Sequence, residues 1–213
     1  MGNNLDTNTI LALAYIGGMG VTLHRLLHHW KAFWSDSSEI DVPQLATMTA
    51  LFLFTPLGIL LQGLAQFLVA SAMGQHIFGL SYSLYFIHVD RSFGSPEDEW
   101  WIALAGNSAT YILGIVALVP AVLAKGIRRP LRLILLDIGL LELGWTLVCR
   151  PLMEFSAGWS GDWATMYAFN FPLASGIVLG IHLLSLILFM VFLVRNPGVH
   201  QLQFRTSETT TNH

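Results

Sequence analysis

Two glutamines, Gln62 and Gln66, lie four residues apart in a long apolar run of this sequence. Side chains four apart share one face of a helix, which is the spacing of two metal-binding imidazoles that flank a general base. Such a set would support metal-assisted hydrolysis. Here both ligand positions carry carboxamides, and Gly63 occupies the position of the base. These residues leave two interpretations open: hydrogen bonding between helices, and a former metal pocket that now holds water or a ligand.

Ionisable side chains also interrupt two later apolar runs. Asp137 and Glu142 lie in one run and His182 lies in the other. Counted from opposite ends of two antiparallel spans, Glu142 and His182 both fall near mid-bilayer, where ionisable groups are costly and usually face a partner or a cavity. A buried Glu142–His182 pair is the simplest prediction. A proton path, or axial ligation of a haem or chlorophyll-type pigment by His182, are the alternatives.

The composition is that of an integral membrane protein. Apolar residues make up 54% of the 213 positions, charged residues 11%, and the mean hydropathy is +0.61. A soluble domain carries about 25% charged residues. The net charge of -3 gives no indication of nucleic-acid binding, and the lone cysteine, Cys149, excludes an internal disulfide and a cysteine-based zinc site.

Five apolar segments are each close to the ~20 residues that a helix needs to cross hydrocarbon. The sequence therefore predicts an all-α membrane domain over 1–196, followed by a polar tail over 197–213. The second span is long enough to be tilted, or kinked at Pro56. Alternation of apolar and polar residues over 77–89 predicts a short membrane-associated β-hairpin after it. The predicted spans are approximately 9–28, 45–73, 100–124, 131–150 and 172–194.

The basic residues predict the orientation of these spans. Of the ten Lys and Arg residues, only Arg91 and Arg150 fall on one side of the alternating loops, and the other eight fall on the opposite side. The positive-inside rule then places the N-terminus outside and the C-terminus in the cytoplasm, in a bacterial-type plasma membrane. Four tryptophans on the outer side are typical of an aromatic belt: Trp100, Trp101, Trp159 and Trp163. Gly176 and Gly180 form a small-residue face, which predicts that another helix packs closely there.

Three stretches in order resemble the site-2 protease family of intramembrane zinc metalloproteases. Residues 60–74 resemble the family's His-Glu-x-Gly-His helix, with Gln62 and Gln66 in the histidine positions. Residues 101–109 are similar to the segment in which Ala-Gly-Pro opens the next helix, although Asn107 replaces the proline. Residues 144–163 resemble the segment that ends in Asp-Gly, with Asp162 at the position of the third zinc ligand.

The departures from the family pattern imply that the catalytic site is degenerate. Gln62, Gly63, Gln66 and Asp162 would retain one anionic ligand and no general base, whereas zinc prefers imidazole, thiolate or carboxylate ligands. We therefore expect no metal, no cofactor and no enzyme activity.

The predicted function is that of a non-catalytic, site-2-protease-like scaffold or an accessory subunit that contacts the lipid bilayer and other membrane subunits. The alternatives are a pigment- or haem-binding subunit of an electron-transfer or photosynthetic complex, and an active intramembrane metalloprotease.

Overall fold

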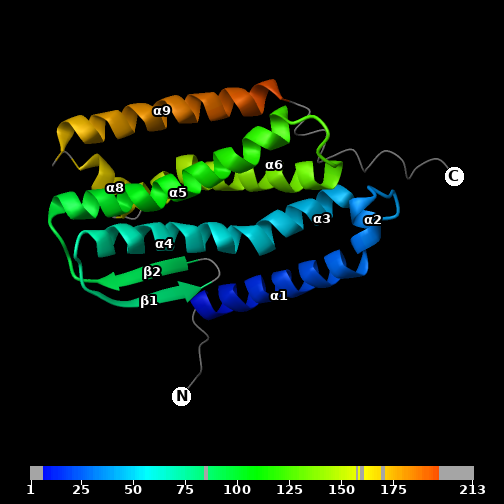
Figure 1. The fold of residues 1–213 in the computed structure, drawn as a ribbon, viewed down its shortest axis with the longest axis horizontal. Helices are drawn as coiled ribbons and strands as arrows, with labels where there is room; N and C mark the ends of the chain where they lie inside the picture. The colour runs from blue at the N-terminus through cyan, green and yellow to red at the C-terminus, as the bar shows by residue number, and fades with distance from the viewer. Residues whose placement is uncertain (1–6, 84–85, 157, 159–160, 169–170, 197–213) are drawn as a thin grey trace, which may run out of the picture.

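The computed structural model describes residues 7–196 apart from 84–85, 157, 159–160 and 169–170, and it shows long helices packed side by side with one two-stranded sheet (Figure 1). The tail 197–213 and Trp159 lie outside the described residues. In chain order the elements are α1 (Thr7–His28), α2 (Trp30–Trp34), α3 (Val42–Thr49), the π-helical turn η1 (Ala50–Phe54), α4 (Thr55–Ala72), β1 (Ile77–Ser83), β2 (Phe86–Arg91), α5 (Pro96–Leu123), α6 (Arg129–Gly144), the π-helical turn η2 (Trp145–Cys149), α7 (Arg150–Ser156), α8 (Asp162–Tyr167) and α9 (Pro172–Arg195).

Four helical segments are long and apolar enough to cross a membrane: Thr9–His28, Val42–Ala72, Pro96–Leu123 and Pro172–Arg195. They coincide with four of the five predicted spans, so the membrane character of the chain is confirmed. The remaining predicted span, 131–150, coincides with α6 and η2. Helix α6 has 16 residues and includes Arg132, Asp137 and Glu142, and it is not among the four. A fifth span therefore stays a prediction.

The second span is one continuous helical segment whose π-helical turn η1 ends two residues before Pro56. Proline lacks an N–H, and its ring collides with the carbonyl four residues earlier in a regular helix. A π turn widens the backbone and relieves that conflict. The same relation recurs between η2 and Pro151. Both π turns therefore have a local cause in the sequence.

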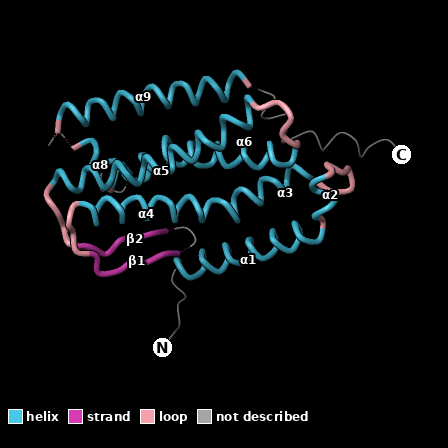
Figure 2. Tube along the Cα trace, viewed as in Figure 1, coloured by secondary structure: helices cyan, strands magenta, loops and turns pink. Residues whose placement is uncertain are grey.

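A two-stranded antiparallel sheet follows α4, and this part of the predicted hairpin is confirmed. In its register Leu80 pairs with Val89 and Ser81 pairs with His88. The hairpin runs alongside α4 (Figure 2), where the Tyr82 hydroxyl donates to the Pro56 carbonyl at 2.9 Å.

An ion pair holds the far end of this hairpin. Arg91 Nη1 lies 2.6 Å from Glu99 Oε1 on α5 and 2.7 Å from Gln75 Oε1. Partnership with Glu99 raises the pKa of the Arg91 guanidinium, so its charge is retained. The hairpin is therefore fixed to both α4 and α5.

The two ends of the molecule differ. At one end, a buried apolar cluster that includes Phe33, Leu45 and Leu133 joins α2, α3 and α6. The α1–α2 connection, the α5–α6 connection and the C-terminal end of α9 also lie there (Figure 1). The opposite end holds α8 and the start of α5, where Trp163 and Met166 pack against Ala103. The polar residues described next lie at this second end.

Candidate functional site: a carboxylate–guanidinium cluster beside a half-open cavity

Gln66 and Asp162 meet in space although 96 positions separate them in the sequence. Gln66 Nε2, on α4, donates to Asp162 Oδ2, at the start of α8, at 2.8 Å. Gly106 of α5 allows this approach, because a Cβ atom there would lie 2.8 Å from Cγ and Nε2 of Gln66. Each of the three stretches that carry the family resemblance thus contributes one residue to this contact: Gln66, Gly106 and Asp162.

Gly63 lies buried beneath the hairpin. A Cβ atom at this position would collide with the side chain of Ile87 on β2. The position that the resemblance assigns to the water-activating glutamate is therefore covered by an apolar side chain. Gln62 is also buried, but the hydrogen bonds of the described residues include none that joins it to Gln66 or Asp162.

Arg150 completes the cluster; it lies within the stretch 144–163, but the family pattern assigned it no role. Its Nη2 lies 2.6 Å from Asp162 Oδ2, and its Nε lies 3.3 Å from Glu154 Oε1. The other oxygen of Glu154 accepts the backbone N–H groups of Trp163 at 2.7 Å and Ala164 at 3.2 Å. Glu154 therefore caps the first turn of α8, where a carboxylate also interacts favourably with the helix dipole.

The two carboxylates share one guanidinium in a poorly hydrated place. Burial is the largest influence, and it raises the pKa of both Asp162 and Glu154 above the usual range. The Arg150 charge opposes this shift at both groups, and the Gln66 hydrogen bond opposes it at Asp162. The ionised form of the pair is therefore favoured by Arg150 and Gln66 at Asp162, and by the backbone N–H of Ala164 together with Arg150 at Glu154.

The residues of this cluster do not fit the zinc ion that the family resemblance implies. A carboxylate only accepts hydrogen bonds, so Gln66 turns its NH2 group, not its oxygen, toward Asp162. Asp162 Oδ2 is already occupied by Gln66 and Arg150, and the guanidinium supplies the positive charge that a metal would bring. Among the described residues, no group of three or more His, Cys, Asp or Glu side chains is placed to hold a metal ion.

His182 is buried on α9, and both of its ring nitrogens have partners. Its Nε2 lies 2.9 Å from the Leu147 carbonyl oxygen, and because a carbonyl only accepts, the proton is on Nε2. The Tyr167 hydroxyl is hydrogen-bonded to Nδ1. The Trp163 ring packs against the imidazole with 4.4 Å between centroids. Axial ligation of a pigment or haem by His182 would therefore require one of these hydrogen bonds to break.

The predicted contact between Glu142 and His182 is not among the hydrogen bonds and ion pairs of the described residues. Glu142 packs against α4 at Gly58, where a Cβ atom would lie 2.8 Å from its carboxyl carbon. Helix α9, which carries His182, instead packs against α8 and η2. Counting residues along two spans estimates their depth in the bilayer, but it does not specify which faces meet.

Two tryptophans expected in an aromatic belt are instead part of the core. Trp100 and Trp163 are each 4% exposed, and Trp100 Nε1 donates to the Met166 carbonyl at 3.0 Å. Only Trp101, among the three described, is substantially exposed, at 44%. Helix α8, which carries Trp163, packs across the start of α5, which carries Trp100, so both rings are buried at this contact.

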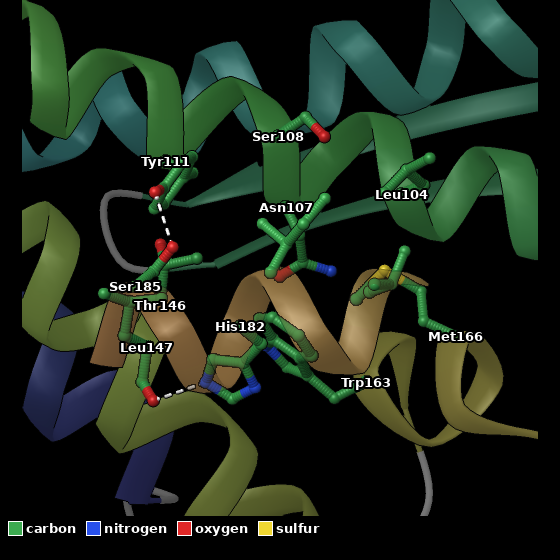
Figure 3. Close-up of a pocket in the computed structure, with 12 residues that line it drawn as sticks. Leu104, Asn107, Ser108, Tyr111, Thr146, Leu147, Trp163, Met166, His182 and Ser185 are labelled. Carbon is green, nitrogen blue, oxygen red and sulfur yellow. Dashed lines mark hydrogen bonds between the residues drawn. The ribbon is translucent and has the colours of Figure 1, made fainter. Parts of the chain in front are cut away.

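A half-open cavity of about 150 Å³ lies next to the cluster, lined by residues of α5, η2, α8 and α9 (Figure 3). Trp163 and His182 form part of its wall, opposite Asn107 of α5. Trp163 directly follows Asp162 in the chain. The hydrogen bonds of the cluster therefore fix the position of α8, the helix that contributes Trp163 to the cavity wall.

The motifs therefore assigned no role in the site to three residues that the structure places there: Arg150, Glu154 and Trp163. Two features of the sequence pointed to Arg150 and Glu154. Arg150 is one of the two basic residues left on the predicted outer side, and Glu154 follows it at the i,i+4 spacing of a helical ion pair. The buried position of Trp163 had no such signal.

In comparisons with known proteins, no family model matches this chain, and no curated protein or solved structure matches it significantly.

Proposed function

We propose that this chain is a non-catalytic, site-2-protease-like membrane protein that serves as a scaffold or accessory subunit of a larger membrane complex. The observation that carries the proposal is the Gln66–Asp162–Arg150 cluster. It joins the sequence stretches that resemble the protease motifs, but a guanidinium occupies the carboxylate that a metal would need. An internal cation of this kind stabilises the packing of α4, α7 and α8 without supplying a Lewis acid or a base.

The lipid-facing surface supports the role of a subunit. Gly176 and Gly180 lie on α9, and a Cβ atom at either position would meet nothing within 4 Å. The helix predicted to pack closely on this face is therefore not one from the described part of this chain. Small residues allow two helix backbones to approach closely in a membrane, so a helix of another subunit fits there.

The orientation belongs to the same proposal. We infer five spans with the N-terminus outside, with α6 and η2 as the fourth span. The arrangement of the two ends supports the alternation of the five spans, because the predicted cytoplasmic connections gather at the end away from the cluster (Figure 1). The choice of orientation rests on the basic residues. Both basic residues left at the outer end are paired with carboxylates, Arg91 with Glu99 and Arg150 with Asp162.

A gain-of-metal experiment tests the relation to the protease scaffold. Gln62→His and Gln66→His, combined with Arg150→Met, would create two imidazoles beside a released Asp162 carboxylate. We expect the purified triple variant to bind one zinc per chain by elemental analysis, and the wild type to bind none stoichiometrically. A control with Leu64→His and Leu68→His has the same spacing on an exposed face of α4 and should bind no stoichiometric zinc.

Equal zinc contents in the triple variant and this control would contradict the proposed relation. The wild type should also leave a transmembrane substrate intact in liposomes. Cleavage that a zinc chelator abolishes would establish the active-protease alternative.

A second experiment tests the role of a subunit. We expect Gly176→Ile with Gly180→Ile to reduce the native mass of the complex extracted gently from its own membranes. Thermal stability of the isolated chain should stay unchanged, because a Cβ atom at either position would meet no described atom within 4 Å. Leu184→Ile, on an exposed face of the same helix, is the matched control. A wild-type protein that migrates as a monomer would contradict the proposal.

A further inference from the structure

The cavity between α5 and α9 is lined by two side chains that each have a polar atom without a hydrogen-bond partner among the described residues. The two atoms are Asn107 Oδ1, an acceptor, and Trp163 Nε1, a donor. Both side chains are 4% exposed, and both line the cavity. Figure 3 shows them approaching it from α5 and α8. A buried polar atom without a partner costs about 1–3 kcal/mol, so this pair is a strong indication of a missing group.

The orientation of the Asn107 amide is fixed by its own helix. Asn107 Nδ2 donates to the Ala103 carbonyl at 3.0 Å. A flipped amide would place its oxygen against that carbonyl and lose the bond, so Oδ1 must be the atom left free. The indole N–H of Trp163 can only donate. The cavity therefore offers one acceptor and one donor.

The other walls are suited to an uncharged, largely apolar molecule. Leu104, Met166 and Val178 line the cavity, and none of the described residues that line it is Lys, Arg, Asp or Glu. A charged group would be desolvated there without a counter-ion, which is unfavourable. Ile181 lines the cavity and is also 55% exposed on the outer surface of α9. A molecule dissolved in the hydrocarbon therefore has a short path to it.

The volume indicates a ligand larger than one water molecule. One water takes up about 30 Å³ of liquid volume, whereas an apolar protein cavity of about 150 Å³ can hold a benzene ring. The cavity has about 150 Å³.

We propose that this cavity binds a lipid-soluble hydroxyl compound of about one aromatic ring, a simple phenol. Its hydroxyl hydrogen is donated to Asn107 Oδ1, and its hydroxyl oxygen accepts the N–H of Trp163. An ether satisfies only Trp163, and a hydrocarbon satisfies neither group. A site built to hydrogen-bond a hydroxyl discriminates against analogues without it, because its own polar groups stay unpaired.

Fluorine NMR on the full chain in lipid nanodiscs tests this site with three probes of similar size: 4-fluorophenol, 4-fluoroanisole and fluorobenzene. We expect saturable binding of 4-fluorophenol, about tenfold tighter than that of fluorobenzene. Trp163→Phe should weaken phenol and anisole binding. Asn107→Leu, which is close in size, should weaken phenol binding and leave anisole binding unchanged. Trp101→Phe removes an exposed indole outside the cavity and serves as the matched control.

Three results would overturn the proposal. The first is equal affinity for phenol and fluorobenzene. The second is phenol binding that neither cavity variant weakens relative to Trp101→Phe. The third is a high-resolution structure in which ordered water bridges Asn107 and Trp163 and saturating phenol does not displace it. Thermal unfolding of Trp163→Phe and Asn107→Leu, each with and without phenol, separates loss of the site from loss of the fold: a folded variant with no phenol-induced rise in Tm supports the assignment.

Discussion

Removal of the Arg150 guanidinium is the most informative perturbation of the cluster. Arg150→Met keeps much of the aliphatic volume and deletes the charge shared by Asp162 and Glu154. Truncating one partner of a fully buried ion pair costs about 3–5 kcal/mol, because an uncompensated charge stays behind. The three side chains here keep 11–23% of their exposed surface. We therefore expect a smaller loss of unfolding free energy, about 2–3 kcal/mol, which lowers Tm by roughly 4–12 °C in a chain of this size.

The pH dependence identifies the cause of that loss. Some carboxyl groups have a higher pKa in the folded state than in the unfolded state. Such a group stabilises the folded state when it is protonated, and that contribution is lost as the pH rises from the unfolded-state pKa through the folded-state pKa. Burial raises the pKa of Asp162 above its ordinary 3.8 and that of Glu154 above 4.5. Without Arg150 both folded pKa values rise further. The loss in Arg150→Met should therefore be larger at pH 8 than at pH 5.

Thermal unfolding in detergent, followed by intrinsic tryptophan fluorescence at both pH values, measures this effect. Arg129→Met is the control, because it breaks the more exposed ion pair with Asp36, of a kind worth about 0–1 kcal/mol. A loss in Arg150→Met no larger than that of Arg129→Met would refute the assigned role of Arg150. A loss that is greater at pH 5 would refute the electrostatic explanation.

Two further predictions concern the helices around the cluster. Glu142→Leu and His182→Leu should change Tm additively, because the structure places their side chains against different helices; a double variant that recovers much of the loss would indicate the direct pair that the sequence suggested. In a variant whose native cysteine is replaced by serine, Ser156→Cys should react with an impermeant maleimide from outside the cell, and Lys125→Cys only after permeabilisation. The reverse labelling pattern would show that the orientation is inverted.

The secondary structure of this chain was largely predictable from local pattern. The apolar runs match the four helices that can cross a membrane, and the alternation over 77–89 matches the hairpin, because helix and strand periodicity are properties of the local sequence. The fourth predicted run is helical too, but Arg132, Asp137 and Glu142 interrupt its apolar character. Length and hydropathy alone therefore do not assign it to the bilayer.

Composition and local periodicity were enough to predict the membrane character, the four long apolar helices and the residue types at the motif positions. Which of those residues meet depends on the packing of the helices. This packing joined Gln66 to Asp162, added Arg150 to them, and placed Glu142 against Gly58 and His182 against Leu147. The physical reason is that periodicity identifies the buried face of a helix but not the neighbour that covers it. That choice depends on how helices distant in the sequence pack together.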